Sequence, residues 1–380
     1  MIHIVRRLTQ GQQRTALLAV VVALVIGAIL LLNESETGLA KKAEIGSQNR
    51  TESIAEKEKE YPRAREIIKP AGFINTNGEE IRIADYIGKK VILIDFWTYS
   101  CINCQRTQPY LNAWQEKYSD DGLLIIGIHT PEFEFEEKYE NVERAVEDAN
   151  ITYPVVLDNE YGTWSAYQNR YWPRKYLIDI DGFIVYDHIG EGNYEETEIK
   201  IQELLEERAV RLGEEMGERE MIATPAGAEE VDRTKPRTPE IYFGALRNAE
   251  HLANGRVSVT GEQTFEHPGT FKSDRLYLGG VWKITSEYAR SVSDDARVIL
   301  PYRAQKVFMV ASSEVGAKAK IYLDGELISD GIGKHVNSDG TIDIQNEQLY
   351  RIVESAEYGV HVLEIVVEEG VIDAFSFTFG

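Results

Sequence analysis

Cysteine is almost absent from this sequence of 380 residues, in which only Cys101 and Cys104 occur. So few thiols exclude the disulfide-rich scaffolds of small secreted domains, which need several bridges. They also exclude a zinc site made of four cysteines, because no second Cys-x-x-Cys pair exists. The two cysteines lie three positions apart in the stretch WTYSCINCQRTQPYL, so their chemistry has to be explained as that of a pair.

Positive charge is also scarce. Lys and Arg number 41 against 63 Asp and Glu, which gives a formal net charge of −22. A nucleic-acid-binding surface needs clustered Lys and Arg to contact phosphates, so no nucleic-acid partner is expected. Hydrophobic residues make up 43% of the chain, which is enough for real cores. The length suits two domains joined by linkers.

Long apolar runs are limited to one, Ala16–Leu32, which reads ALLAVVVALVIGAILLL and carries no charge. At a rise of about 1.5 Å per residue, such a helix just spans the hydrocarbon core of a bilayer. Three arginines precede the run and two glutamates follow it, which favours a cytoplasmic N-terminus and an extracytoplasmic remainder. We therefore expect a single-pass anchor in the cytoplasmic membrane, with a cleaved signal peptide as the alternative.

The rest of the chain divides by composition and pattern. After the tail and anchor of residues 1–33, a polar stalk is predicted for 34–66. Over 67–212, apolar runs such as VILIDFW and LLIIGIH alternate with helical segments, which predicts an α/β domain around a central sheet. One of its helices is expected to open with Thr130-Pro131-Glu132 as N-cap, N1 and N2. A linker at 213–238 then leads to short alternating segments over 239–380, which predict an all-β sandwich.

The Cys-x-x-Cys pair follows a predicted buried strand and opens a predicted helix. At that place the free N–H groups of the helix N-terminus and the helix dipole favour the thiolate of Cys101. Cys104 lies one turn later, close enough to form a disulfide with Cys101. The pair can therefore attack a substrate disulfide and then resolve the mixed disulfide itself. The only cofactor that this chemistry needs is the redox-active disulfide Cys101–Cys104.

Two other interpretations of the pair remain open. A metal site would need more ligands, and although His129 and His188 could in principle complete one, neither shows paired ligand spacing, so no metal is expected. A purely structural disulfide would close so short a loop that it would constrain the unfolded chain little.

Three further residues are candidates for the same chemistry. Asp95 lies in the apolar run six residues before Cys101, where burial should raise its pKa and let it relay protons to the buried sulfur. Pro109 either kinks the helix or ends it early. Pro173 directly precedes a predicted strand, and a cis Trp172–Pro173 bond would present the backbone of Trp172 to an extended substrate; a trans loop proline is the alternative.

In order and spacing, these residues resemble the thioredoxin superfamily. The longer strings WTYSCINCQRTQPYL, GIHTPEFEFE and RYWPRKYLID look like those of DipZ-type and TlpA/redoxin-like thiol–disulfide proteins. The resemblance covers about residues 67–212. It implies a thioredoxin fold with Cys101 as nucleophile, Cys104 as resolving thiol and Pro173 as cis-proline. The C-terminal part is similar to the carbohydrate-binding-like domain that follows the redox domain in such proteins, which implies a glycan as a candidate ligand.

The resemblance also implies partners. Clients would be proteins that carry disulfides. DipZ-type proteins carry a multi-pass CcdA-like electron-transfer domain before the redox domain, whereas this sequence has a single apolar span there. Electrons are therefore expected from a separate membrane donor, such as a CcdA-like protein.

Four residues are candidate substrate contacts. Trp97 and Trp172 lie beside the cysteine pair and the proline in the matched motifs, Arg174 follows that proline, and His129 ends a predicted strand near the active face. Four nearby glutamates, Glu132, Glu134, Glu136 and Glu137, look like a metal cluster, but at a helix opening they more simply serve the dipole and the solvent.

Three functions compete at this stage. The first is a membrane-anchored, extracytoplasmic thiol:disulfide oxidoreductase that reduces or exchanges client disulfides. The second is a thiol peroxidase of the redoxin type, in which Thr98 and Arg174 would surround an activated thiolate. The third is a surface binding protein whose β-sandwich recognises a glycan or a partner. In that domain Phe271, Tyr277 and Trp282 could stack on a sugar, although core packing is the simpler role for them.

Overall fold

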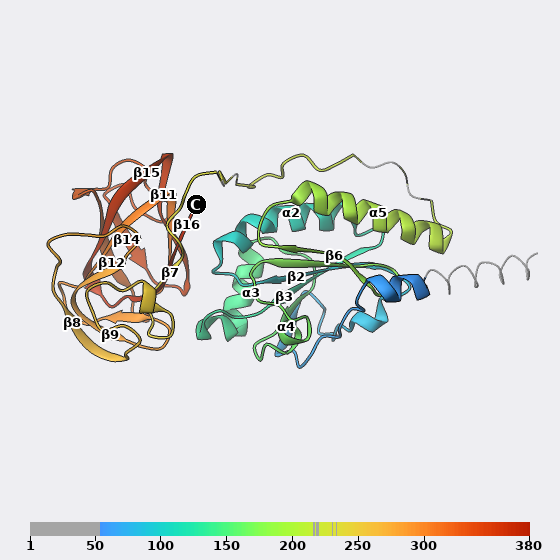
Figure 1. Ribbon diagram of the computed structural model, residues 1–380, viewed down its shortest axis with the longest axis horizontal. Coiled ribbons are helices and arrows are strands. Elements are labelled where there is room, and N and C mark those ends of the chain that lie inside the picture. The colour runs from blue at the N-terminus through green and yellow to red at the C-terminus, as the bar shows by residue number, and fades with distance from the viewer. Residues whose placement is uncertain (1–53, 216, 218–219, 230, 233) are drawn as a thin grey trace, which may run out of the picture. The chain divides into compact units, whose positions relative to one another are not determined.

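The computed structural model describes residues 54–380 except 216, 218, 219, 230 and 233 (Figure 1). The predicted anchor and most of the predicted stalk lie outside the described residues. Among those described, no helix is both long enough and apolar enough to cross a membrane. The chain separates into two compact units between Pro62 and Arg63, and both folded domains belong to the unit Arg63–Gly380.

The first domain of this unit is the predicted α/β domain. Its strands, in the order in which they pair, are β1 Gly72–Ile74, β4 Val155–Leu157, β3 Leu123–His129, β2 Val91–Trp97, β5 Arg174–Ile178 and β6 Ile184–Ile189. Its helices are η1 Ile83–Asp85, α2 Ile102–Tyr118, η2 Glu134–Glu137, α3 Tyr139–Asp148, α4 Gly162–Ala166 and α5 Tyr194–Leu212.

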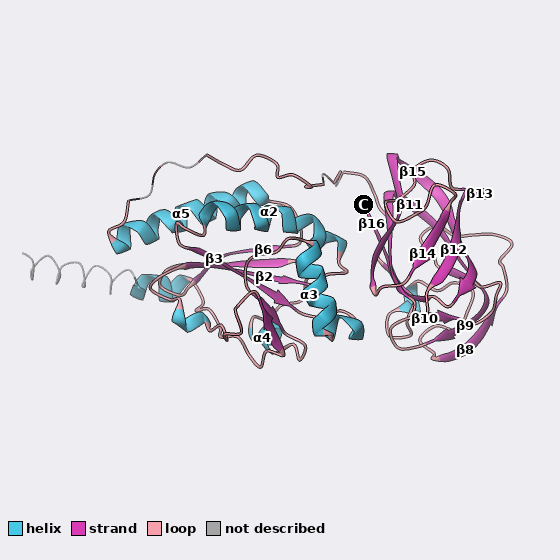
Figure 2. Cartoon of the chain, turned by 180° about the vertical axis from the view of Figure 1, so that it is seen from behind, coloured by secondary structure: helices cyan, strands magenta, loops and turns pink. Residues whose placement is uncertain are grey.

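Strand β2 lies at the centre of this sheet because both of its faces are covered. It pairs in parallel with β3 and antiparallel with β5, and all of its residues are buried. One face carries Leu93 and Trp97 and packs against α2, α3 and α5, whereas Ile94 and Phe96 on the other face pack towards η1 and α4. Figure 2 shows α2 and α5 on one side of the sheet and α4 on the other. Burial on both faces explains why the strand reads as a continuous apolar run. It also means that Asp95 is taken out of water by the fold.

Two expectations about local structure are corrected. Thr130-Pro131-Glu132 opens no helix: the chain stays irregular there, makes the short 3₁₀ turn η2, and begins α3 only at Tyr139. The reason is Glu136, whose carboxylate accepts hydrogen bonds from the N–H groups of Glu132 and Phe133 at 2.6 and 3.0 Å. Helix α2, by contrast, runs through Pro109 to Tyr118, so the early helix end is wrong.

The boundary of the α/β domain also lies slightly earlier than predicted. Arg63 forms a β-bridge with Phe183, and Glu66 accepts hydrogen bonds from the N–H groups of Ile83 and Ala84 at 2.7 and 3.2 Å. The sequence pattern places these residues in the stalk, but their hydrogen bonds make them part of the α/β domain.

The second domain is rich in β-structure, as predicted. Its elements are β7 Ile241–Tyr242, η3 Asn248–Glu250, β8 Gly261–Phe265, β9 Tyr277–Ile284, β10 Ala289–Ser291, β11 Arg297–Ser312, β12 Ala317–Leu323, β13 Glu326–Leu327, β14 Thr341–Ile344, β15 Gln348–Gly370 and β16 Asp373–Phe379.

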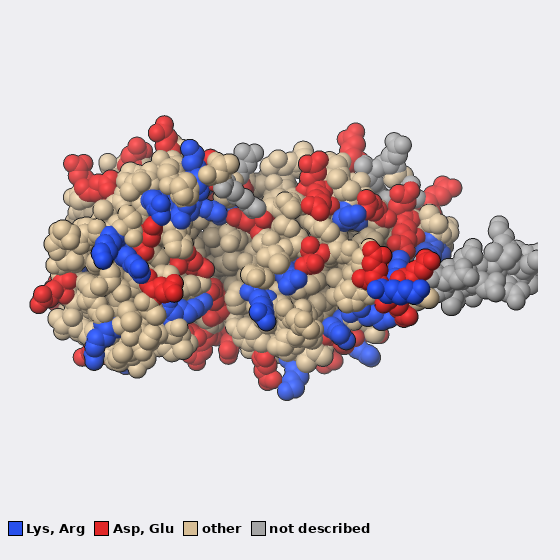
Figure 3. All heavy atoms as spheres, in the orientation of Figure 1, with Lys and Arg blue, Asp and Glu red and all other residues tan. Residues whose placement is uncertain are grey.

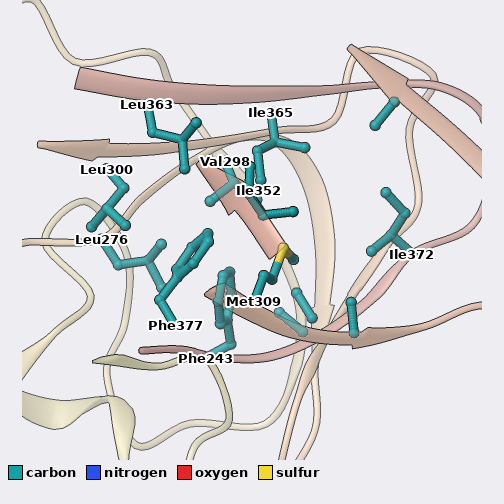
Figure 4. Close-up of a cluster of buried hydrophobic side chains, with 14 of the residues drawn as sticks. Phe243, Leu276, Val298, Leu300, Met309, Ile352, Leu363, Ile365, Ile372 and Phe377 are labelled. Carbon is teal, nitrogen blue, oxygen red and sulfur yellow. The ribbon is translucent and has the colours of Figure 1, made fainter. Parts of the chain in front are cut away.

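The strands of this domain form one hydrogen-bonded network rather than two separate sheets. The main path runs β13-β12-β15-β11-β16-β10-β9-β8, and an additional pairing of β11 with β9 closes a ring of strands. Strands β11 and β15 are long and carry register shifts, which let one strand contribute to two layers. Their inward side chains, among them Val298, Met309 and Ile365, enclose the core in Figure 4.

The aromatic residues of the β-rich domain that invited a sugar-stacking role are mostly core residues. Trp282 is fully buried and Tyr277 is 5% exposed, so neither presents a ring face to solvent. Phe271 is partly exposed and packs its ring edge-on against Tyr277. Core packing is therefore confirmed for Trp282 and Tyr277.

Charged side chains are intermixed over the surface. Acidic and basic groups alternate over the face that Figure 3 presents, with no broad basic area on it. On that face nothing favours the phosphate contacts that nucleic-acid binding requires.

Candidate functional site

The two cysteines lie at the start of α2, just after the loop that follows β2. Cys101 is the N-cap residue of α2, with an extended backbone, and its sulfur accepts a hydrogen bond from the N–H of Cys104 at 3.4 Å. Both thiols are free; Cys101 is half-buried, whereas Cys104 is fully buried. A sulfur that accepts from an N-terminal amide of its own helix is well placed to carry negative charge.

The environment of Cys104 has the opposite effect. Burial raises the pKa of the Cys104 thiol well above its usual value, and the neighbouring Cys101 and Asp95 add to this shift. Cys104 therefore keeps its proton until a nearby base removes it. The two sulfurs differ as a nucleophile and a resolving thiol are expected to differ.

Asp95 is the buried base candidate. Its side chain is 1% exposed, and desolvation raises its pKa from 3.8 to about 7, even though the nearby Lys175 lowers it. No described group hydrogen-bonds to its Oδ1 atom. A carboxyl group with a pKa near 7 can both accept and return a proton at neutral pH. The predicted burial and raised pKa of Asp95 are found in the structure, while its relay role stays a prediction.

Lys175 is a residue that the sequence reasoning missed. It is the cross-strand partner of Asp95 on β5, and its side chain has no exposed surface. Desolvation lowers the pKa of its ammonium group, whereas the charges of Asp95 and Cys104 raise it. Its Nζ atom lies 3.5 Å from the carbonyl oxygen of Gly190. The only signal in the sequence was a lysine inside a predicted strand, two residues after Pro173.

Two polar side chains complete this buried cluster. Tyr153 donates its hydroxyl to Gln108 Oε1 at 2.5 Å, and both residues are buried. The pKa of Tyr153 is raised by burial, with Asp95 and Cys104 contributing. The space beneath α2 thus holds one thiol, one carboxyl, one ammonium and one phenol group with little access to water.

The Trp172–Pro173 peptide bond is cis. The carbonyl oxygen of Pro173 accepts a hydrogen bond from the N–H of Gly190 at 2.8 Å. The indole of Trp172 donates to the carbonyl oxygen of Thr130 at 3.0 Å and lies against Trp164, with ring centroids 4.3 Å apart. Trp172 is half-buried, so part of its ring reaches the surface. Its role in substrate binding stays a prediction.

The other predicted substrate contacts lie differently from expectation. Trp97 is 2% exposed and His129 has no exposed surface, so neither side chain reaches a client at the surface. Burial lowers the pKa of His129 to about 3, so its ring is neutral and offers no positive charge to a thiolate. Arg174 forms an ion pair with Asp187 at 2.6 Å. These residues pack around the site or pair within the domain.

Glu136 is the second residue that the sequence reasoning misjudged. Instead of facing solvent at a helix opening, it is fully buried, and desolvation raises its pKa to about 7. Its carboxylate accepts from the hydroxyl and the N–H of Ser100, at 2.6 and 3.3 Å. Ser100 directly precedes Cys101, so Glu136 ties the segment after β3 to the loop that carries the nucleophile candidate.

A group of acidic residues away from the cysteines could suggest a metal. Asp179, Asp181 and Glu207 lie close enough together to share an ion. Arg211, however, forms an ion pair with Asp181 at 2.7 Å and lies 3.5 Å from Glu207. Its guanidinium group already supplies the positive charge that these carboxylates need.

Residues 63–187 match the AhpC/TSA family, and residues 238–380 match the family described as thioredoxin like C-terminal domain. Protein DipZ of Mycobacterium bovis is 33% identical over 310 residues, which is 81% of this chain and 41% of that protein. The chain therefore spans less than half the length of this relative.

Two shorter proteins match about a third of the chain. The thiol-disulfide oxidoreductase YkuV of Bacillus subtilis is 29% identical over 131 residues, or 34% of this chain and 87% of that protein. A solved thioredoxin-family thiol:disulfide interchange protein from Chlorobium tepidum covers 38% of this chain and 99% of its own, with 19% identity and a TM-score of 0.31. The chain thus carries a thioredoxin-like AhpC/TSA domain followed by a thioredoxin like C-terminal domain, and it is a homologue of DipZ.

Proposed function

We propose that the protein is a membrane-anchored, extracytoplasmic thiol:disulfide oxidoreductase that reduces or exchanges client disulfides through Cys101 and Cys104. The observation that carries this proposal is the asymmetry of the two sulfurs. Cys101 is half-buried at the N-terminus of α2, while Cys104 is fully buried in the cluster of Asp95 and Lys175. The similarity to proteins named as thiol-disulfide oxidoreductases supports the same activity.

The reaction follows from this geometry. The Cys101 thiolate attacks one sulfur of a client disulfide, forms a mixed disulfide and releases the other client sulfur as a thiolate. Asp95 then accepts the proton of Cys104, and the Cys104 thiolate attacks Cys101 Sγ. The second client sulfur leaves and takes up a proton. Two electrons have passed to the client, and the protein holds a Cys101–Cys104 disulfide.

The reduced state of Cys101 and Cys104 has to be restored by electrons from outside the chain. Each turnover leaves a disulfide that must be reduced again, and Cys101 and Cys104 are the only cysteines of the sequence. A separate membrane donor, such as a CcdA-like protein, would supply the electrons. The apolar run Ala16–Leu32 would keep the redox domain beside that donor.

The experiment that tests the proposal is a measurement of insulin-disulfide reduction together with the reduction potential of the Cys101–Cys104 couple. A potential near −270 mV, about that of thioredoxin, favours donating electrons, and one near −120 mV favours oxidising clients. We expect insulin reduction and a value at the reducing end. A strongly oxidising value would reverse the direction assigned here.

A thiol peroxidase is the second candidate, because the AhpC/TSA family matches residues 63–187. The geometry gives it less support. The hydroxyl of Thr98 lies 3.4 Å from His129 Nε2 in the interior, and Arg174 is paired with Asp187, so neither is directed at Cys101 as a peroxide site requires. Consumption of hydrogen peroxide by the purified protein, at rates above those of free cysteine, would favour the peroxidase.

A further inference from the structure

We propose that the β-rich C-terminal domain positions the loop Thr98–Ser100 and thereby sets the reactivity of Cys101. This assigns to the domain a role inside the redox site, in place of an independent binding function. The meaning of this role for client reduction rests on the proposed function above, but the contacts that carry it do not.

The first contact is direct and involves Tyr99, two residues before Cys101. Tyr99 is 7% exposed, and its hydroxyl donates to the carbonyl oxygen of Glu347 at 3.1 Å. Glu347 precedes β15 in the β-rich domain, and its carboxylate accepts from Lys138 Nζ and from Asn141 Nδ2, both at 2.7 Å. Glu347 of the second domain thus forms hydrogen bonds with three residues of the first domain, Tyr99, Lys138 and Asn141.

The second contact surrounds the segment between β3 and α3. Glu132 accepts from the hydroxyl of Tyr242 at 2.9 Å and from Arg247 Nη1 at 2.6 Å. Phe375 packs against Phe133 and Phe135, with ring centroids 5.1 and 4.8 Å away. Apolar packing and charge-assisted hydrogen bonds therefore hold the same short segment from the side of the β-rich domain.

This segment reaches the catalytic loop through Glu136. Its buried carboxylate accepts both the N–H and the hydroxyl of Ser100, as described above. The β-rich domain therefore holds the loop twice, directly at Tyr99 and through Glu136 at Ser100. Cys101, which follows immediately, packs against the apolar cluster that contains Phe375 and Leu349 of the β-rich domain.

The position of this loop matters for the chemistry. The sulfur of Cys101 accepts an N–H of its own helix at 3.4 Å, and this contact stabilises a thiolate only while the loop holds the sulfur over the helix N-terminus. A displacement of a fraction of an ångström at a reacting atom is enough to change rates severalfold. Loosening the loop should thus change the reactivity of Cys101 without removing any group that touches it.

The test compares variants of the full chain that cut these contacts. Tyr99→Phe removes the hydroxyl that reaches Glu347 and keeps the ring, and Glu347→Ala removes the carboxylate that binds Lys138 and Asn141. Two quantities are measured: the rate of alkylation of Cys101 by iodoacetamide in a Cys104→Ser background, and the equilibrium constant of the Cys101–Cys104 couple against glutathione. We expect each variant to change both at least threefold, which for the couple corresponds to about 14 mV.

A matched control separates positioning from general damage to the second domain. Glu364 is a partly exposed glutamate of the same domain, and its carboxylate pairs with Arg297 of that domain at 2.9 Å. Glu364→Ala should leave both quantities at their wild-type values, and Glu347→Gln, which keeps an acceptor oxygen, should recover part of the change. The thermal unfolding midpoint of each variant shows whether it is folded. If Glu347→Ala does not fold, the milder variant Tyr99→Phe still provides the test.

Values for folded Tyr99→Phe and Glu347→Ala equal to those of Glu364→Ala would overturn the proposal. Alkylation needs no client, so the two proposals fail separately. A wild-type protein that does not reduce disulfides, but whose Tyr99→Phe variant alkylates differently, contradicts the proposed function and leaves the positioning role standing.

Discussion

Cys101 and Cys104 share a sequence motif but not an environment. Cys101 caps a helix and is half-buried, whereas Cys104 lies in a closed space where burial raises its pKa. Cys101 is the more accessible of the two sulfurs, and the buried Cys104 lies beside it. The order of events in the proposed reaction is a consequence of this difference in access.

The first prediction tests that order. Cys104→Ser leaves the attack of Cys101 intact but removes the thiol that resolves the mixed disulfide, so client adducts should accumulate. Cys101→Ser should form few adducts and lose activity, because a serine hydroxyl is a poor nucleophile near neutral pH. Non-reducing gels of both variants expressed in cells provide the measurement. Adducts on Cys101→Ser alone would mean that the two roles are reversed.

The second prediction concerns the proton relay at Asp95. Only the ionised carboxylate accepts the proton of Cys104, so the rate of resolution should rise as the pH increases through about 7, the raised pKa of this group. Asp95→Asn should abolish that step in the pH profile and slow resolution at pH 7 by about 100-fold, a typical contribution of a general base. Release of client thiol in single-turnover stopped-flow experiments gives the profile.

Lys175 supplies the control for the second prediction. Its positive charge lowers the pKa of Asp95, so Lys175→Met should move the step in the pH profile to higher pH. A purely structural lysine would change the rate at every pH alike and leave the midpoint where it is. A profile without any step in the wild type would contradict the relay itself.

At the scale of elements, the segment between β3 and α3 links the catalytic loop to the rest of the fold. Its centre is Glu136, whose carboxylate accepts four hydrogen bonds, two of them from Ser100 and the others from the N–H groups of Glu132 and Phe133. Ser100 and Phe133 are buried, so their N–H and hydroxyl groups depend on the carboxylate of Glu136 for an acceptor. Loss of the Glu136 carboxylate therefore leaves several buried polar groups without a hydrogen-bond acceptor at once.

The third prediction follows from that arrangement. Glu136→Ala should lower the free energy of unfolding by about 3 kcal/mol or more, since each buried donor that loses its acceptor costs about 1–3 kcal/mol. Urea unfolding, followed by tryptophan fluorescence, measures the difference. Glu134→Ala, two residues away with an exposed side chain, is the matched control and should change stability by less than about 0.5 kcal/mol. Equal effects of the two variants would show that the hydrogen bonds of Glu136 contribute little.

The elements that could be predicted are those whose pattern follows from their own burial. VILIDFW and LLIIGIH are apolar apart from Asp95 and His129, because β2 and β3 are covered on both faces. The helix expected at Thr130 did not form because its capping pattern is local, whereas the structure there is decided by the carboxylate of Glu136, six residues further on. In the β-rich domain the residue pattern predicted the strands but not how they pair, because alternation of residues cannot show that β11 also pairs with β9.

The part of the site that could be predicted is the part whose residues lie in one short sequence motif. Cys101, Cys104 and Asp95 could be found because they lie within ten residues of one another. Lys175 joins them only through the register of β2 and β5, and Glu136 only through the path of the segment after β3. A lysine in a strand and a glutamate at a turn are ordinarily solvent-exposed, so composition alone points the wrong way for both.

At the scale of the whole molecule, the proposed function requires the redox domain and its electron donor to be on the same side of one membrane. The reaction consumes two electrons per client disulfide, and the sequence offers no third cysteine through which they could enter. A soluble donor would have to diffuse to the site at every turnover. A tethered domain beside a membrane donor meets it at a far higher effective concentration.

The last prediction tests this topology. The run Ala16–Leu32, with its preceding arginines, favours a cytoplasmic N-terminus and an extracytoplasmic remainder. Protease added to intact spheroplasts should therefore digest an epitope tag placed after Gly380, while a tag placed before Met1 stays protected until the membrane is broken. Replacing four leucines or valines of the run by glutamine should release the protein from the membrane fraction, because each polar residue at that depth opposes insertion. A C-terminal tag that is protected in intact spheroplasts would put the cysteines on the cytoplasmic side. A soluble form without the run, found outside the cell, would instead mean that the run is a cleaved signal peptide and that the electron donor has to be reached by diffusion.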